Sequence, residues 1–552
     1  MEGVTALAAS LGLLTGSCAA PSWRTPPYDL RFQRVPDPVL HPRPARADER
    51  DWWYVAEQTT VRPLGELVSP THWADRASGG GAPALDVNAF GEVMDSTWFT
   101  NRLGRRPLTV EEVARGPNTK PRPARGLLLV ESGKLSGASP GLVVVDEDGD
   151  RFIVKFDPPA HPGLASGAEV IATKILHAAG YNVPENYVLT FDSRKLVLQE
   201  GAMGPGPEGR PVPLTEKGLT DLVTLANPTL RGRVRGMFSR VLPGDPIGPF
   251  DYTGRRRDDP NDTIPHERRR SLRGLRWFSA WINNTDVRAS NTFDVFREVE
   301  PDRGYVVHYL IDFGDALGSL GTKSKYANDG HEPLFSWGVL AELVFTAGLR
   351  YRWWLPAQRS PYRSVGMFEA AVFRPELWSS SIPNPAFDAC DPHDTFWAAS
   401  IIARFTREMV DATVAQAEYR SEDAAQYVAD TLWLRREKIL AMAFSRISPL
   451  SDPAVIDRTV RWTDLGVTSG LHRASDVRYR YWLEGARGRF EGSAAGARRV
   501  DLPLPALPDE GTGFLSLHVE RTVARGQRLV TVLRLRRDGP LLRMIGLERP
   551  VR

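Results

Sequence analysis

Short apolar runs separated by turn residues predict a β-rich segment in the second hundred residues of the chain. Residues 127–130, 142–145 and 152–156 are rich in valine, leucine and isoleucine, and the turn 146–149 separates the last two runs. Such runs around a turn that ends in glycine are typical of a β-hairpin. Further strands are expected at 187–191 and 195–199.

Other stretches carry apolar residues at helical spacing. The pattern over 168–179 predicts a helix, and Gly180 is a typical stop signal after it. Further helices are expected over 268–282, through 397–409, and as a pair of helices over 423–444. After residue 455, apolar and polar positions alternate with period two, which predicts a small antiparallel β module over 455–552. The expected fold class is α+β, with an irregular N-terminal extension over 19–124 that packs on the main body.

Composition excludes several classes of protein. Lys and Arg number 70 against 67 Asp and Glu, so the net charge of +3 argues against a nucleic-acid binder driven by bulk charge. A hydrophobic fraction of 42% is ordinary for a folded soluble chain. The cysteines are Cys18 and Cys390, too few for a disulfide scaffold.

The first 18 residues have the pattern of an export signal. Residues 4–14 are mostly apolar, a run too short to span a bilayer, and small residues precede Cys18. This order resembles a bacterial lipoprotein signal, which implies an exported cell-envelope protein attached to a membrane through lipidated Cys18. The acidic Glu2 and the lack of a basic residue before the run depart from such signals. The alternative is a frayed apolar terminus on a cytoplasmic protein.

A lysine inside an apolar strand is the first candidate for chemistry. Lys155 lies in the run 152–156, where a buried ammonium would need a partner, and Glu169 on the following helix could provide it. The alternative is an edge-strand lysine that reaches solvent. Upstream, Gly137 and Gly141 stand between two strands, where glycines let backbone amides approach phosphates. The same residues fit a G-x-S-x-G elbow, but no helix follows the serine; a plain turn is the other alternative.

The most specific pattern comes later. Asp286 and Asn291 are separated by four residues after a predicted helix, and a strand over 305–310 then leads to Asp312-Phe-Gly. This order is typical of kinases, where the first aspartate serves the acceptor hydroxyl and Asn291 and Asp312 would bind Mg²⁺. The alternative is a turn with Asx caps and an aspartate at a strand end. The mixed-charge stretch 255–270 is expected to be a solvated loop and helix start.

In this order the motifs resemble the protein-kinase-like superfamily, above all its atypical branch with the HipA-type, phosphoinositide, CotH and secretory-pathway kinases. The resemblance covers roughly 125–450 and implies a two-lobed fold, with an N-lobe over 125–250 and a helical C-lobe over 251–450. It also implies ATP and Mg²⁺ as cofactors, Lys155 on phosphate and Glu169 as its helix partner. The sequence departs from typical protein kinases at Asn283-Asn284-Thr285, which stand where His-Arg would precede Asp286.

Two hypotheses are consistent with these patterns. The first is an ATP- and Mg²⁺-dependent phosphotransferase that acts on a protein or small-molecule acceptor. The second is a catalytically inactive pseudokinase lipoprotein of the cell envelope that works as a binding or scaffold protein. Retention of all five polar residues favours the first, and export favours the second because ATP is scarce outside the cytoplasm.

Overall fold

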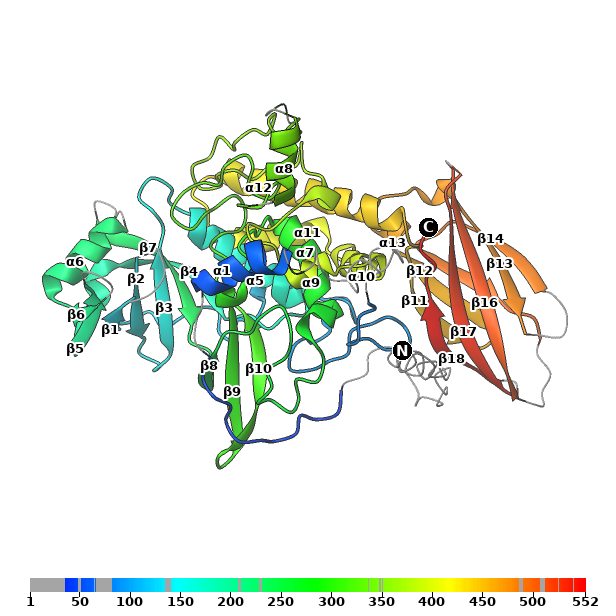
Figure 1. Ribbon diagram of the computed structural model, residues 1–552, viewed down its shortest axis with the longest axis horizontal. Coiled ribbons are helices and arrows are strands. Elements are labelled where there is room, and N and C mark those ends of the chain that lie inside the picture. Colours follow the sequence, from blue (N-terminus) through cyan, green and yellow to red (C-terminus); the bar gives the residue numbers. More distant parts are fainter. Residues whose placement is uncertain are drawn as a thin grey trace, which may run out of the picture.

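Strands gather at both ends of the molecule and helices fill the middle, as Figure 1 shows. The computed structural model describes residues 35–47, 51–63, 65, 82–134, 140–206, 210–226, 228, 231–335, 337–346, 349, 351–485, 490–506, 512–524, 526–539 and 541–552. The expected signal segment 1–18, with Cys18, and the expected loop glycine Gly137 lie outside the described residues.

The strands expected in the second hundred residues form one mixed sheet in the order β4-β7-β3-β2-β1-β5-β6. The hairpin between β2 and β3 is confirmed, and β1 pairs with β5 in parallel. The strands are β1 (Leu128–Gly133), β2 (Gly141–Val145), β3 (Arg151–Phe156), β4 (Asn186–Asp192), β5 (Leu196–Pro205), β6 (Pro211–Pro213) and β7 (Arg233–Arg240).

Each face of this sheet packs against a different helix. Val154 and Phe238 belong to the core cluster that includes side chains of α6 (Glu216–Leu225). On the other face, Met237 packs against Val170 of α5 (Leu164–Ala179). Because side chains alternate along a strand, Lys155 shares the face of Met237, its cross-strand partner, and points toward α5.

The middle of the chain is helical, with two differences from expectation. The helix expected through 397–409 ends at Ile402, because the Thr406 side chain caps a second helix by accepting from the Met409 amide at 3.3 Å. The pair expected over 423–444 is one helix, α12, since neither glycine nor proline interrupts it. The helices are α7 (Arg270–Ile282), α8 (Trp337–Phe345), α9 (Pro385–Asp388), α10 (Pro392–Ile402), α11 (Arg407–Ala415) and α12 (Glu422–Phe444). No described helix is both long and apolar enough to cross a bilayer.

A smaller sheet has the order β10-β9-β8 and extends below the helices in Figure 1. Its strands are β8 (Asp245–Gly248), β9 (Thr292–Glu300) and β10 (Arg303–Leu310). β9 and β10 are antiparallel, with Thr292 opposite Leu310. The residues just before β9 therefore lie beside those just after β10.

The expected C-terminal antiparallel strands are confirmed and begin at Leu450, slightly earlier than predicted. They form two sheets, β11-β12-β15 and β14-β13-β16-β17-β18, whose inward side chains share one core. The elements are β11 (Leu450–Ile456), β12 (Thr459–Asp464), α13 (Leu465–Thr468), β13 (Val477–Glu484), β14 (Phe490–Ala495), β15 (Arg499–Pro503), β16 (Thr512–Val523), β17 (Arg528–Asp538) and β18 (Leu541–Glu548).

The extension before the large sheet contributes to the central core and includes α1 (Asp51–Ala56) and α4 (Val110–Arg115). Trp98 and Phe99 belong to the same cluster as α5 and α7. The expectation of a solvated charged loop is wrong for part of 255–270. Asp262 is buried and its carboxylate lies 2.8 Å from both His266 Nε2 and Arg269 Nη2. Arg269 also lies over the Trp98 ring. The buried charges are paired there, and composition alone does not reveal the partners.

We expect Gly180→Ala to lower the free energy of unfolding by about 3 kcal/mol. Gly180 has a φ of 137°, and a Cβ there would overlap the Phe99 ring. Gly149→Ala is the control, because Gly149 has a φ of 81° with nothing within 4 Å of the added carbon. Urea unfolding followed by tryptophan fluorescence should show a clearly larger loss for Gly180→Ala. Equal losses of unfolding free energy in the two variants would mean that overlap with the Phe99 ring does not destabilise Gly180→Ala.

Candidate active site

The ammonium of Lys155 joins two parts of the fold. Its Nζ lies 3.4 Å from Glu169 Oε2 on α5 and 2.8 Å from Asp312 Oδ1 after β10. The predicted contact between Lys155 and Glu169 is therefore confirmed. The alternative of an edge-strand lysine that reaches solvent is wrong, because the Lys155 side chain is only 18% exposed. Asp312, which the order of motifs places at the same site, is the second partner.

Glu169 is fixed from several directions. Its side chain is buried, with Oε1 accepting from Asn186 Nδ2 at 3.4 Å and the carboxylate accepting from the Phe313 amide. Asn186 in turn donates to the Thr173 hydroxyl of α5 at 2.8 Å. Helix α5, strand β4 and the segment after β10 thus converge on one carboxylate, which holds Lys155 in place.

Asp286 and Asn291 lie together in the loop between α7 and β9. Asn291 Nδ2 donates to Asp286 Oδ2 at 2.8 Å and to its carbonyl oxygen at 2.7 Å. Asp286 also pairs with Arg288, with Nε and Oδ1 2.9 Å apart. These contacts close the loop on itself and leave Asn291 Oδ1 as the amide atom available to a ligand.

Asp312 follows β10 and reaches the same place because of strand pairing. The Ile311 amide donates to the Asn291 carbonyl at 3.0 Å, which continues the β9–β10 ladder by one step. Asp312 has a φ of 57°, a left-handed conformation that costs energy for a residue with a Cβ. Its side chain is 48% exposed. The reason is that the left-handed turn directs the carboxylate into a cleft.

The cleft holds the candidate residues in a volume of about 200 Å³. Asp286, Asn291 and Asp312 line it together with Lys155 and Glu169. The other lining residues are Lys134, Phe156, Ala165, Ser166, Met237, Arg288, Gly314, Asp315, Leu320 and Gly321. Residues that are distant in the sequence therefore form one site. They come from the position after β1, from β3, α5 and β7, and from the loops before β9 and after β10.

The charges of the cleft influence each other strongly. Burial alone would lower the pKa of Lys155, but Glu169 and Asp312 raise it above its ordinary value. Burial raises the pKa of Glu169 despite Lys155, and Asp312 adds to the rise. Enclosure of the carboxylate in the cleft would likewise raise the pKa of Asp312, but Lys155 and Lys134 hold it below its ordinary value. Asp312 is thus an anion at neutral pH, as a metal ligand requires.

Sequence reasoning did not identify the cleft residues Lys134 and Asp315, or Lys325, whose charge acts on Asp315. Lys134, at the end of β1, has a pKa lowered by burial and by Lys155. Burial raises the pKa of Asp315 to about 7, with Asp286 and Asp312 adding to the rise against Lys325. The buried Lys325 donates to the Thr285 hydroxyl at 2.6 Å. None of the three stands in a recognisable motif.

The glycines expected to approach phosphate stand apart from this set. Gly141, the first residue of β2, pairs with Lys155 but does not line the described part of the cleft. A Cβ at Gly141 would overlap the Val154 carbonyl oxygen, so the close approach of β2 and β3 explains this glycine. Gly137 falls outside the described residues.

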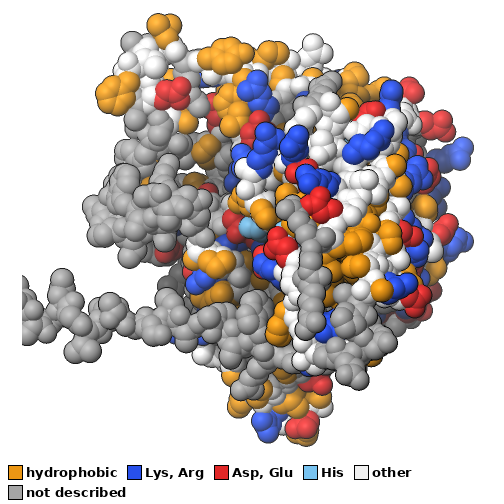
Figure 2. Space-filling model, turned by 90° about the vertical axis from the view of Figure 1, so that its right-hand side faces the viewer, with side chains coloured by type: hydrophobic (Ala, Val, Ile, Leu, Met, Phe, Trp, Pro, Cys, Tyr) orange, Lys and Arg blue, Asp and Glu red, His pale blue; other side chains and the backbone are white. Residues whose placement is uncertain are grey.

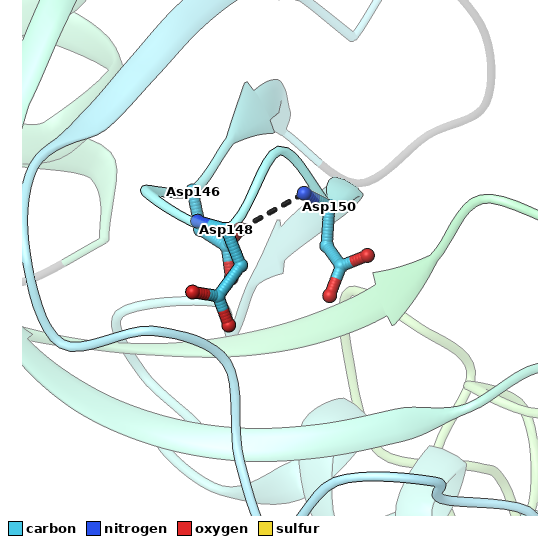
Figure 3. Close-up of side chains that lie close together, drawn as sticks. All are labelled: Asp146, Asp148 and Asp150. Carbon is cyan, nitrogen blue, oxygen red and sulfur yellow. Dashed lines mark hydrogen bonds between the residues drawn. The ribbon is translucent and has the colours of Figure 1, made fainter.

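A separate group of carboxylates lies in the turn between β2 and β3 (Figure 3). Asp146, Asp148 and Asp150 bring oxygens within 4.8 Å of one another, and the Asp150 amide donates to Asp146 Oδ1 at 2.9 Å. Lys120 Nζ lies 2.7 Å from oxygens of both Asp148 and Asp150, and Arg240 also pairs with Asp150. Lys120 and Arg240 therefore offset part of the negative charge of this group, whose hydrogen bonds shape the turn.

We expect Asp315 to make stability depend on pH. Its folded pKa of about 7 lies above the ordinary value of 3.8, so folding binds a proton and stability falls as pH rises from about 4 to about 7. Asp315→Asn removes this dependence. In thermal melts without metal, the melting temperature of the variant relative to that of the wild type should therefore rise as the pH increases from about 4 to about 7. A difference independent of pH would show that Asp315 is ionised throughout.

Among solved structures, the chain is similar to the Golgi casein kinase, while no family model and no curated protein matches it. The Golgi casein kinase with Mn/ADP bound is 12% identical with a TM-score of 0.28, covering 70% of this chain and 88% of that one. A second structure of the Golgi casein kinase is 10% identical with a TM-score of 0.27, covering 74% and 96%. These scores are too low to establish a shared fold, so the chemistry of the cleft must be judged from its own geometry.

Proposed function

We propose that the protein is an ATP- and Mg²⁺-dependent phosphotransferase with two kinase-like lobes, over 125–250 and 251–450. One observation carries the proposal. Lys155 is ion-paired to both Glu169 and Asp312 in a cleft that also holds Asp286 and Asn291. Phosphoryl transfer needs a fixed cation for phosphates, oxygen ligands for a metal and a carboxylate near the acceptor, and this cleft provides each.

Two lysines line the cleft. Lys155 and Lys134 are both lining residues, and Lys155 adds to the effect of burial in lowering the pKa of Lys134. A nucleoside triphosphate would bind there, with Lys155 on its phosphates and Glu169 keeping the lysine oriented. Lys155 would then exchange its contact with Asp312 for phosphate and release that carboxylate.

The metal ligands fit Mg²⁺. Asp312 contributes a carboxylate, and Asn291 has its Oδ1 available because Nδ2 donates to Asp286. Mg²⁺ prefers oxygen ligands and commonly binds through one or two carboxylates together with phosphates. Two protein ligands are therefore sufficient. Bound Mg-ATP would supply the phosphoryl group and neutralise its charge during transfer.

Asp286 is the candidate catalytic residue. Its carboxylate would accept the proton of the acceptor hydroxyl as that oxygen bonds to the terminal phosphorus and the bond to the bridging oxygen breaks. Arg288 and Asn291 position the carboxylate. The acceptor is a protein or a small molecule with a hydroxyl group. We also propose export and attachment to the cell envelope through lipidated Cys18, on the sequence pattern alone.

We expect Asp312→Asn to lower turnover by about a hundredfold or more while the fold is retained. The amide keeps the shape but loses the charge that binds the metal. Asp501→Asn is a matched control, because Asp501 is 49% exposed and lies 2.7 Å from Arg461, much as Asp312 is 48% exposed and lies 2.8 Å from Lys155.

The measurement is the rise in melting temperature on adding ATP with Mg²⁺, together with ADP release. Wild type and Asp501→Asn should show the full rise, and Asp312→Asn a reduced one. The same rise in all three proteins would show that Asp312 is not a metal ligand. A rise in the wild type without any ADP release would favour the pseudokinase alternative.

We expect Asp286→Asn to separate catalysis from nucleotide binding. Loss of the proton acceptor should reduce kcat by about 10² to 10⁴-fold. Asp286 does not contact Lys155, so the KM for ATP should change little. Steady-state kinetics of ADP release would measure both constants. A large rise in KM with an unchanged kcat would place Asp286 in nucleotide binding instead.

A further inference from the structure

A surface segment far more apolar than its surroundings follows the cleft residues in sequence. Apolar side chains between residues 334 and 355 are largely exposed: Leu334 (72%), Val344 (72%), Phe345 (87%), Leu349 (86%), Tyr351 (83%) and Leu355 (64%). Figure 1 places α8 of this segment at the top of the molecule, and Figure 2 shows hydrophobic side chains gathered at that height. Exposed apolar residues are normal when scattered, but a gathered patch marks an interaction surface.

The charges around the patch are mainly positive. Residues 343–368 contain Arg350, Arg352, Arg359 and Arg363 and no aspartate or glutamate. Arg352, Arg359 and Arg363 are not buried. The acids that flank this stretch are Glu342, which is exposed on α8, Glu369, which is buried, and Glu332, which accepts a hydrogen bond from Trp354 Nε1 at 2.9 Å. The surface of residues 334–363, which we name the α8 surface, is therefore apolar with a mainly positive border, in which Glu342 is the one acid of the sequence.

Aromatic residues lie between the arginines. The sequence 349–355 reads Leu-Arg-Tyr-Arg-Trp-Trp-Leu, and the Arg352 guanidinium lies 5.7 Å from the centre of the Trp354 ring. Tyrosine and tryptophan combine an apolar body with a polar tip, and arginine carries its charge on an apolar stem. Trp354 is buried and donates to Glu332, so it anchors the segment, while the exposed Tyr351 and Arg352 suit the boundary between lipid headgroups and acyl chains.

We propose that the α8 surface docks on an anionic lipid bilayer. The exposed side chains enter the interface, and the exposed arginines contact acidic headgroups: Val344, Phe345, Leu349, Tyr351 and Leu355 for the first, and Arg352, Arg359 and Arg363 for the second. The charge pattern selects this partner, because an anionic surface complements the stretch 343–368, which has four arginines and no acid. The contact is peripheral, since no described helix can cross a bilayer. The proposal does not depend on catalysis.

The test measures binding of the full chain to lipid vesicles by cosedimentation. All proteins carry Cys18→Ser, so that no acyl chain at that position contributes. Vesicles contain phosphatidylglycerol in phosphatidylcholine, or phosphatidylcholine alone. The parent protein should bind the acidic vesicles, and Phe345→Ser/Leu349→Ser should bind about tenfold more weakly because two exposed apolar side chains are lost. Phe514→Ser is the control, since Phe514 is 67% exposed on the β module.

A second variant tests the charge independently of the apolar residues. Arg352→Gln/Arg359→Gln should weaken binding to acidic vesicles and reduce its sensitivity to salt. The proposal is overturned if the parent protein does not cosediment with acidic vesicles, or if both double variants bind these vesicles as well as the parent does. Self-association that depends on Phe345, without vesicle binding, would instead assign the α8 surface to a second copy of the chain.

Discussion

A lysine ammonium in an apolar strand is tolerated only where carboxylates surround it, and this constraint organises the structure around Lys155. The strand β3 must present the lysine toward α5, so the register of the large sheet is tied to the position of Glu169. The turn after β10 must bring Asp312 to the same ammonium. Each carboxylate lowers the cost of burying the ammonium, and loss of one would leave the other as its counter-charge.

The surrounding fold provides this convergence through ordinary packing. Strand alternation places Lys155 and Met237 on the face that α5 covers. The antiparallel pairing of β9 with β10 places Asn291 beside Ile311, and thereby beside Asp312. One strained backbone conformation lies within the site. Asp312 has a left-handed backbone at the point where the candidate chemistry would occur.

Periodicity and turn residues predicted those parts of the fold that depend on local patterns, and motif order predicted the core of the candidate site. The β2–β3 hairpin and the helix ending at Gly180 are examples. Predictions failed where a competing interaction decided the outcome: the Thr406 cap divides an apolar stripe into two helices. Lys134 could not be found, because its neighbours Lys155 and Asp312 lie far away in sequence, and Asp315, although close to Asp312, owes its raised pKa mainly to burial that the sequence does not reveal.

The most direct test of the account is whether nucleotide phosphates lie against Lys155. An ATP analogue with a reactive acyl phosphate transfers its acyl group to lysines next to the bound phosphates, and mass spectrometry locates the modified residues. We predict that Lys155 is labelled, with Lys134 as the other site, and that excess ATP with Mg²⁺ prevents both modifications. Labelling spread over surface lysines, unaffected by ATP, would contradict the central claim.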